Sequence, residues 1–151
     1  MPKPLVVDAS LLFRLILPGP HQAGVDALVS GWLANGYGLF APSLAAYELT
    51  SALAKAVHFQ QITAEEGRRA LALAQRLGVQ LVAPHDELVR SAFVWTLCLE
   101  RAAAHDSFHL TLAERLEEIR RRFKVASLRL FGSVARDESD SHSDVDILVS
   151  F

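Results

Sequence analysis

Three carboxylates in the first 110 residues stand where an α/β fold gathers its chemistry. Asp8 follows the apolar run "PLVV", and Glu48 and Asp106 each lie in the first turns of an expected helix. If these ends share one edge of a sheet, the repulsion between three negative charges calls for a cation, and a hard divalent ion with oxygen ligands suits it. Each position also has a structural interpretation, because Asp8 can cap a helix and Glu48 and Asp106 can interact favourably with a helix N-terminus.

A second group of chemically suggestive residues lies in the stretch "GSVARDESDSHSDVDILVSF" at 132–151. Gly132 and Ser133 follow an expected strand, and Asp144 and Asp146 alternate with apolar residues on the next one. Backbone donors and a hydroxyl in such a turn can hold nucleotide phosphates. Two carboxylates two residues apart on a strand point to the same side, where they can bind the metal ions that clamp a triphosphate. The alternative is an acidic loop that leads into an edge strand.

Strands and helices alternate along the chain, which predicts the fold class. The expected strands are the apolar runs at 4–7, 39–42, 79–83, 127–131 and 145–151. Segments with helical spacing of apolar residues lie between most of them, and Thr63 with Glu66 gives one helix a capping-box start. This order predicts an α/β protein with a parallel sheet, helices on both faces and its chemistry at the carboxyl ends of the strands.

The composition is that of a globular protein. Of the 151 residues, 51% are hydrophobic and 21% charged, and the net charge of −2 does not suggest a polyanion binder. No apolar run approaches the roughly 18 residues that a membrane-spanning helix needs, and the first residues lack the pattern of a secretory signal. Cys98 is the single cysteine, which excludes an internal disulfide, and its apolar surroundings predict a buried thiol. We expect a cytoplasmic protein with no membrane partner.

Three segments resemble the acidic segments of PIN-domain ribonucleases, in particular the VapC-like toxins of bacterial toxin–antitoxin pairs. They read "LVVDASLLFRLIL", "APSLAAYELTSALAKAV" and "HDSFHLTLAERL", and they cover roughly residues 4–116 in the family's order. The resemblance implies a PIN-like three-layer fold in which Asp8, Glu48 and Asp106 are the catalytic, metal-binding carboxylates and Ser10 is a supporting hydroxyl. The implied activity is hydrolysis of RNA phosphodiester bonds with Mg²⁺ or Mn²⁺. The implied partners are the RNA substrate, an antitoxin protein and a second copy of the chain in a homodimer.

The sequence departs from this family after the third acidic segment. PIN domains usually continue with a strand that ends in Thr-Ala-Asp or a similar motif, which supplies a fourth carboxylate. Here "LAER" runs into "LEEIRRRFKVASLRLFGSVARDE", so that Gly132 and Ser133 stand at the carboxyl end of the corresponding strand. We therefore expect a site that holds one metal ion and is impaired by the lack of the fourth acid.

The last segment, from "RLEEIRRRFKVASLRLFGSVARDESDSHSDVDILVSF", resembles the beginning of a minimal nucleotidyltransferase of the antitoxin-associated MNT kind. By this resemblance Gly132, Ser133, Asp144 and Asp146 would bind the nucleotide and its metal ions. The sequence ends at Phe151, before the family's third carboxylate, so we expect this segment to have no catalysis of its own.

These resemblances predict the domain organisation. We expect a PIN-like domain over residues 1–124 and a truncated nucleotidyltransferase-like segment over 125–151 that packs on the PIN sheet and supplies its last strands. The apolar residues Phe108, Leu112, Leu116, Ile119 and Phe123 keep helical spacing across the junction. One continuous helix is therefore expected there, with 127–131 completing the parallel sheet.

Three functions stand as hypotheses. The first is a metal-dependent endoribonuclease of a toxin–antitoxin system, which acts through Asp8, Glu48 and Asp106. The second is a nucleotidyltransferase-like protein that binds a nucleoside triphosphate through its C-terminal motif. The third is a non-catalytic interaction module that keeps the PIN fold.

Overall fold

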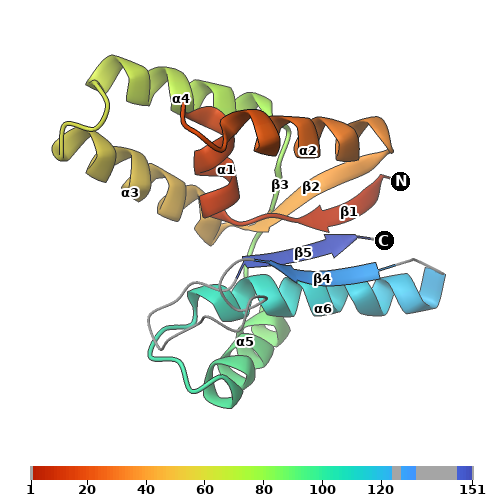
Figure 1. Ribbon diagram of the computed structural model, residues 1–151. Coiled ribbons are helices and arrows are strands. Elements are labelled where there is room, and N and C mark those ends of the chain that lie inside the picture. The colour runs from red at the N-terminus through yellow and green to blue at the C-terminus, as the bar shows by residue number, and fades with distance from the viewer. Residues whose placement is uncertain (1, 124–126, 132–145, 151) are drawn as a thin grey trace.

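The computed structural model describes residues 2–123, 127–131 and 146–150 of the chain. In these residues six helices and five strands are formed, and helices lie on both sides of a central sheet (Figure 1). The elements in chain order are β1 (Lys3–Val6), α1 (Ala9–Ile16), α2 (Gln22–Ala34), β2 (Tyr37–Pro42), α3 (Leu44–His58), α4 (Ala64–Arg76), β3 (Gln80–Val82), α5 (Asp86–Cys98), α6 (His105–Phe123), β4 (Ser127–Phe131) and β5 (Asp146–Ser150). The predicted α/β class is confirmed.

The strands β1, β2 and β3 form a parallel sheet in that order. Leu5 of β1 lies opposite Leu39 of β2, and Phe40 of β2 lies opposite Gln80 of β3. Each crossover between neighbouring strands passes through helices, as parallel pairing requires. All three strands therefore end on the same edge of the sheet, and the chain leaves β1 and β2 towards α1 and α3 from that edge.

Alternate residues of β1 enter two different hydrophobic cores. Leu5 of β1 and Val7, which directly follows the strand, are buried among residues of α1–α4, and Val6 is buried on the other face with Leu88 of α5 and Leu112 of α6. Successive side chains of a strand point to opposite faces, so this pattern shows that both faces of β1 are covered. The predicted helix face of α6 is confirmed where it is described, because Phe108 and Leu116 pack on the same cluster as Leu112.

The C-terminal strands differ from the expectation. β4 was expected to complete the parallel sheet, but it pairs with β5 in an antiparallel ladder that places Phe131 opposite Asp146. β5 in turn lies beside β1, between the parallel sheet and α6 (Figure 1). Both strands are short and rich in apolar residues, and an antiparallel partner that follows along the chain satisfies the hydrogen bonds of β4 locally. α6 continues to Phe123, so the predicted single helix across the junction is confirmed.

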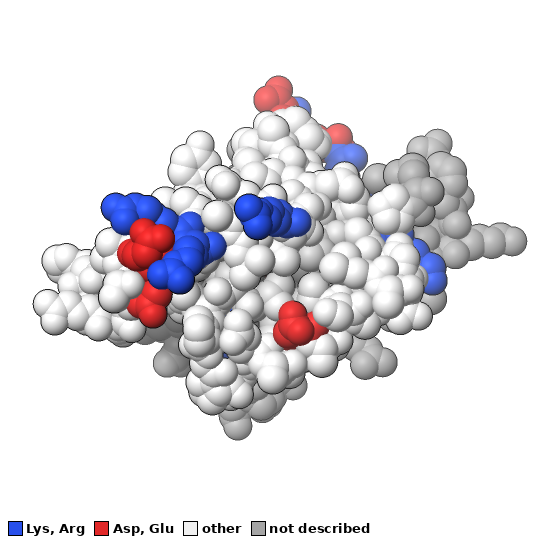
Figure 2. All heavy atoms as spheres, turned by 90° about the horizontal axis from the view of Figure 1, so that it is seen from above, with Lys and Arg blue, Asp and Glu red and all other residues white. Residues whose placement is uncertain are grey.

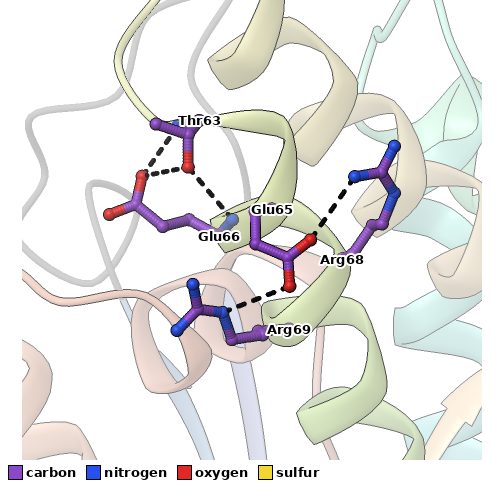
Figure 3. A network of polar contacts seen from close by, with 5 residues as sticks. All are labelled: Thr63, Glu65, Glu66, Arg68 and Arg69. Atoms are coloured by element: carbon purple, nitrogen blue, oxygen red, sulfur yellow. Dashed lines mark hydrogen bonds and ion pairs between the residues drawn. The ribbon is translucent and has the colours of Figure 1, made fainter.

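The start of α4 carries the capping box that its sequence predicts. The backbone N–H of Glu66 donates to the Thr63 hydroxyl over 3.2 Å, and the Thr63 N–H donates to the Glu66 carboxylate over 2.7 Å. Glu65, one residue earlier, faces Arg68 and Arg69 across ion pairs of 3.5 and 3.6 Å (Figure 3). The cap satisfies backbone donors that every helix N-terminus leaves free. The hydrogen bonds that the Glu66 carboxylate accepts from Thr63 also lower the pKa of Glu66.

Some apolar residues are more exposed than their types suggest. Cys98, predicted to be buried, is exposed at the end of α5, and Phe59 after α3 is 67% exposed. Phe93 and Leu97 of α5 are each 61% exposed, so the buried stripe of this helix is narrower than its composition implies. None of the helices in the described part of the chain is long and apolar enough to cross a membrane.

Candidate active site

Asp8 stands directly after β1 and caps α1. Its Oδ1 accepts a hydrogen bond from the backbone N–H of Leu11 over 2.8 Å, and its Oδ2 accepts one from the Ser10 hydroxyl over 3.0 Å. The structural interpretation of this residue is therefore correct. A carboxylate oxygen has two lone pairs, so each oxygen of Asp8 keeps the capacity for a further ligand.

Glu48 and Asp106 come from two other elements. Glu48 lies in the second turn of α3, and its side chain is 28% exposed. Asp106 is the second residue of α6, and its side chain is 24% exposed. A buried hydrogen bond of 2.8 Å between the hydroxyls of Thr96 and Ser107 ties this end of α6 to α5. The position of Asp106 thus depends on the packing of α6 against α5, because α6 does not directly follow a strand of the parallel sheet.

One cavity brings the three carboxylates together. It has a volume of about 390 Å³. Its lining residues are Asp8, Ala9, Ser10, Phe13, Arg14, Glu48, Ala52 and Asp106. The end of β1 and the first turns of α3 and α6 lie on the same side of the molecule (Figure 1). The structure thus places Asp8, Ser10, Glu48 and Asp106 around one cavity, and their metal-binding and catalytic roles stay predictions.

Burial has the largest effect on the ionisation of Glu48 in the cavity. Partial burial raises the pKa of Glu48 above its ordinary value of 4.5, and the negative charges of Asp106 and Asp8 raise it further. His109 and His105 act in the opposite direction, and Nδ1 of His105 lies 3.9 Å from Oε1 of Glu48. A cation bound beside Glu48 would favour the charged form of this side chain and offset the effects of burial and of the neighbouring acids.

Glu48→Gln should stabilise the protein near neutral pH when divalent ions are removed. With a raised pKa, the folded state holds the proton of Glu48 more tightly than the unfolded chain does, so its contribution to stability falls as pH rises above 4.5 and through the folded-state pKa. Glutamine has no proton to lose. Urea unfolding in EDTA at about pH 4 and about pH 7 should show a gain for the variant at the higher pH only. Glu118→Gln, at an exposed position on α6, is the control; equal pH profiles for Glu48→Gln and the wild type would contradict this account.

The donor set of the cavity fits a hard divalent ion in kind. Carboxylate and hydroxyl oxygens are the ligands that Mg²⁺ and Mn²⁺ take in proteins. In this structure, however, no three His, Cys, Asp or Glu side chains of the described residues are grouped closely enough to hold a metal ion. Asp106 instead lies 3.5 Å from Arg101, so this ion pair has to loosen before the three carboxylates can share one cation.

Two arginine side chains near the carboxylates were not singled out from the sequence. Arg14 lines the cavity from α1, four residues after Ser10 and so on the same face of that helix. Arg101, between α5 and α6, pairs with Asp106 and is 16% exposed. Helical spacing from Ser10 was a signal for Arg14, whereas Arg101 reaches Asp106 through a loop whose path the sequence does not indicate.

The surface offers little further attraction for a polyanion on the side drawn in Figure 2. There Lys and Arg lie among Asp and Glu, and most of the face between them carries no charge. No extended basic field, of the kind that attracts a polyanion, covers this described face.

The second predicted site lies mostly outside the described residues. Gly132, Ser133 and Asp144 belong to the part of the chain that is not described, and Asp146 is described as the first residue of β5. The geometry of a nucleotide site there is therefore not part of the structure. What is established is the ladder that joins Asp146 to Phe131, the last residue of β4.

Comparison with known proteins supports the C-terminal resemblance. The nucleotidyltransferase domain family matches residues 112–151, less than half of the chain. The match starts inside α6 and includes Gly132, Ser133, Asp144 and Asp146. No match to a PIN domain accompanies it, so the resemblance of residues 4–116 to PIN ribonucleases stays a prediction. No curated protein matches the chain.

Proposed function

We propose that the chain is a metal-dependent endoribonuclease with a PIN-like fold, acting as the toxin of a toxin–antitoxin pair. The observation that carries the proposal is the convergence of Asp8, Glu48 and Asp106, from three separate elements, on one cavity of about 390 Å³. Glu48 is partly buried beside two further acids, and burial, with smaller contributions from the charges of Asp106 and Asp8, raises its pKa. Such an arrangement costs stability unless a cation binds there, which favours a functional origin.

The residues of the cavity have distinct roles in this proposal. Asp8, Glu48 and Asp106 hold the Mg²⁺ or Mn²⁺ ion, and the Ser10 hydroxyl fixes the orientation of the Asp8 carboxylate through its 3.0 Å hydrogen bond. When bound, the ion supplies polarisation of the phosphate and a water of lowered pKa. Arg14 receives a phosphate of the RNA at the cavity rim.

RNA cleavage by paired variants tests this function. Asp106→Asn should lower Mn²⁺-dependent cleavage of a single-stranded RNA by at least roughly 100-fold, the upper end of what the loss of even an outer-shell partner of a metal costs. Asp146→Asn should retain the activity, because β5 is assigned no part in the site. Cleavage that survives Asp106→Asn but is lost in Asp146→Asn would overturn the assignment. Absence of cleavage by the wild-type protein at saturating Mn²⁺ would favour the non-catalytic interaction module.

A second candidate is a nucleotidyltransferase-like protein that binds a nucleoside triphosphate with Mg²⁺. The family match to residues 112–151 supports it more directly than any comparison supports the first. In this reading Ser133 contacts the phosphates, and Asp144 and Asp146 hold the metal ions. ATP at 100 times its Kd should stabilise the fold by about 2.7 kcal/mol, and Asp144→Asn should remove the shift. An unchanged melting temperature at saturating ATP–Mg²⁺ would exclude this candidate.

A further inference from the structure

His109 is a buried histidine with an unsatisfied nitrogen. Its side chain is 4% exposed, and its Nε2 has no hydrogen-bond partner. A buried polar atom without a partner destabilises the folded state, because it has lost its hydrogen bonds to water and gained none. Native structures keep few such atoms, and each calls for an explanation such as an ion that binds there.

The hydrogen bond of Nδ1 determines whether Nε2 of His109 carries a proton. Nδ1 lies 3.2 Å from the backbone carbonyl oxygen of His105. A carbonyl oxygen accepts only, so Nδ1 carries the proton and donates it, and Nε2 of the neutral ring is left with a lone pair. Histidines that bind metals have this arrangement, with one nitrogen donating to a carbonyl and the other free for the metal.

His109 lies on the same helix as Asp106, near two of the three carboxylates. His109 follows Asp106 by three residues and His105 by four on α6, so that all three share one face of the helix. The charges of Glu48 and Asp106 both act on its ring. The ring is buried and is not part of the cavity lining, so the ring and the carboxylates have to move closer together before Nε2 can reach an ion in the cavity.

We propose that Nε2 of His109 is a nitrogen ligand of the cation held by Asp8, Glu48 and Asp106, and that it makes the site select Mn²⁺ over Mg²⁺. This inference rests on the proposed metal site. Mg²⁺ takes oxygen ligands almost exclusively, whereas first-row transition metal ions accept imidazole nitrogen readily. Adding one imidazole to three carboxylates therefore raises affinity for Mn²⁺ more than affinity for Mg²⁺.

Pulsed electron paramagnetic resonance of Mn²⁺ bound to the full chain tests this ligand without using activity. Direct coordination should give a ¹⁴N modulation in the wild-type spectrum that disappears in both His109→Gln and His109→Leu. The two variants should also lose roughly 10–100-fold in Mn²⁺ affinity, with a smaller loss for Mg²⁺ measured by competition. Gln keeps a polar side chain, and Leu suits the buried position, so failure of one variant to fold leaves the other. His21→Gln, an exposed histidine at the start of α2, is the matched control.

The outcomes separate this inference from the proposed function. If Asp8→Asn abolishes Mn²⁺ binding but no ¹⁴N modulation is present, the carboxylate site exists and His109 is not its ligand. If Mn²⁺ binding survives Asp8→Asn and Glu48→Gln unchanged, the carboxylate site itself is wrong and the inference falls with it. A modulation that survives in both His109 variants but is lost in His21→Gln would show adventitious binding at an exposed histidine and overturn the assignment.

Discussion

Asp8→Asn should remove metal binding and RNA cleavage while leaving the fold intact. Asp8→Ala should remove the same functions and should also lower the stability of the fold. Asp8 caps α1 through the 2.8 Å hydrogen bond from the N–H of Leu11 and also lines the carboxylate cavity. Asparagine caps a helix about as well as aspartate, but alanine loses about 0.5–2 kcal/mol at such a position. The neutral amide removes the charge that a divalent ion requires. The pair therefore separates the structural role of Asp8 from its chemical role.

Two measurements on the same preparations check this result. Calorimetric titration with Mn²⁺ should show affinity lower by at least roughly tenfold in both variants, and urea unfolding in EDTA should show reduced stability in Asp8→Ala alone. Ser10→Ala is a milder companion, because it removes the hydrogen bond to Oδ2 of Asp8 and leaves the carboxylate itself in place. Full Mn²⁺ affinity in Asp8→Asn would mean that Asp8 is a helix cap and nothing more.

The sequence predicts this site because its members mark the ends of regular elements. Asp8 ends an apolar strand and Glu48 lies early in the helix that follows the next strand, so the carboxyl edge of a parallel sheet brings these two positions together. Asp106 opens a further helix and reaches the cavity through the packing of that helix. The prediction needed no side-chain geometry. Strands, helices and helix caps can also be predicted, because they depend on residues close together in the sequence, as the capping box of Thr63 and Glu66 shows.

The sequence does not predict what depends on tertiary packing. The burial of His109 and its free Nε2 follow from how α6 packs against the rest of the chain, and periodicity alone marks His109 as one polar residue in a helix. The antiparallel pairing of β4 with β5 is a choice between two partners for one short apolar strand. Composition does not decide between them, because a short apolar strand suits either sheet. Cys98 is a further example, because its apolar neighbours in the sequence predict burial and the residue is exposed in the structure.

Leu5→Ala should be the most destabilising single change in the strand that leads to the site. Leu5 is fully buried, packs in the core formed with α1–α4 and lies opposite Leu39 in the sheet. Truncation of a buried leucine typically costs about 2–5 kcal/mol, through lost burial and the cavity left behind. The free energy of unfolding of a typical domain is only about 5–15 kcal/mol, so this one side chain contributes a large share of it. The urea midpoint should fall with little change in the slope m.

The matched control for Leu5→Ala is Leu81→Ala, a leucine on β3 that is 51% exposed. Leu81→Ala should lower the free energy of unfolding by no more than the roughly 0.5 kcal/mol expected of surface substitutions. Saturating Mn²⁺ should raise the stability of the wild type and of Leu5→Ala by equal amounts, since an ion that binds only the native state adds the same free energy to both. An increment that shrinks in Leu5→Ala would show that the packing of β1 also holds Asp8 in its binding position. Equal costs for the two leucine variants would contradict the assignment of Leu5 to the core.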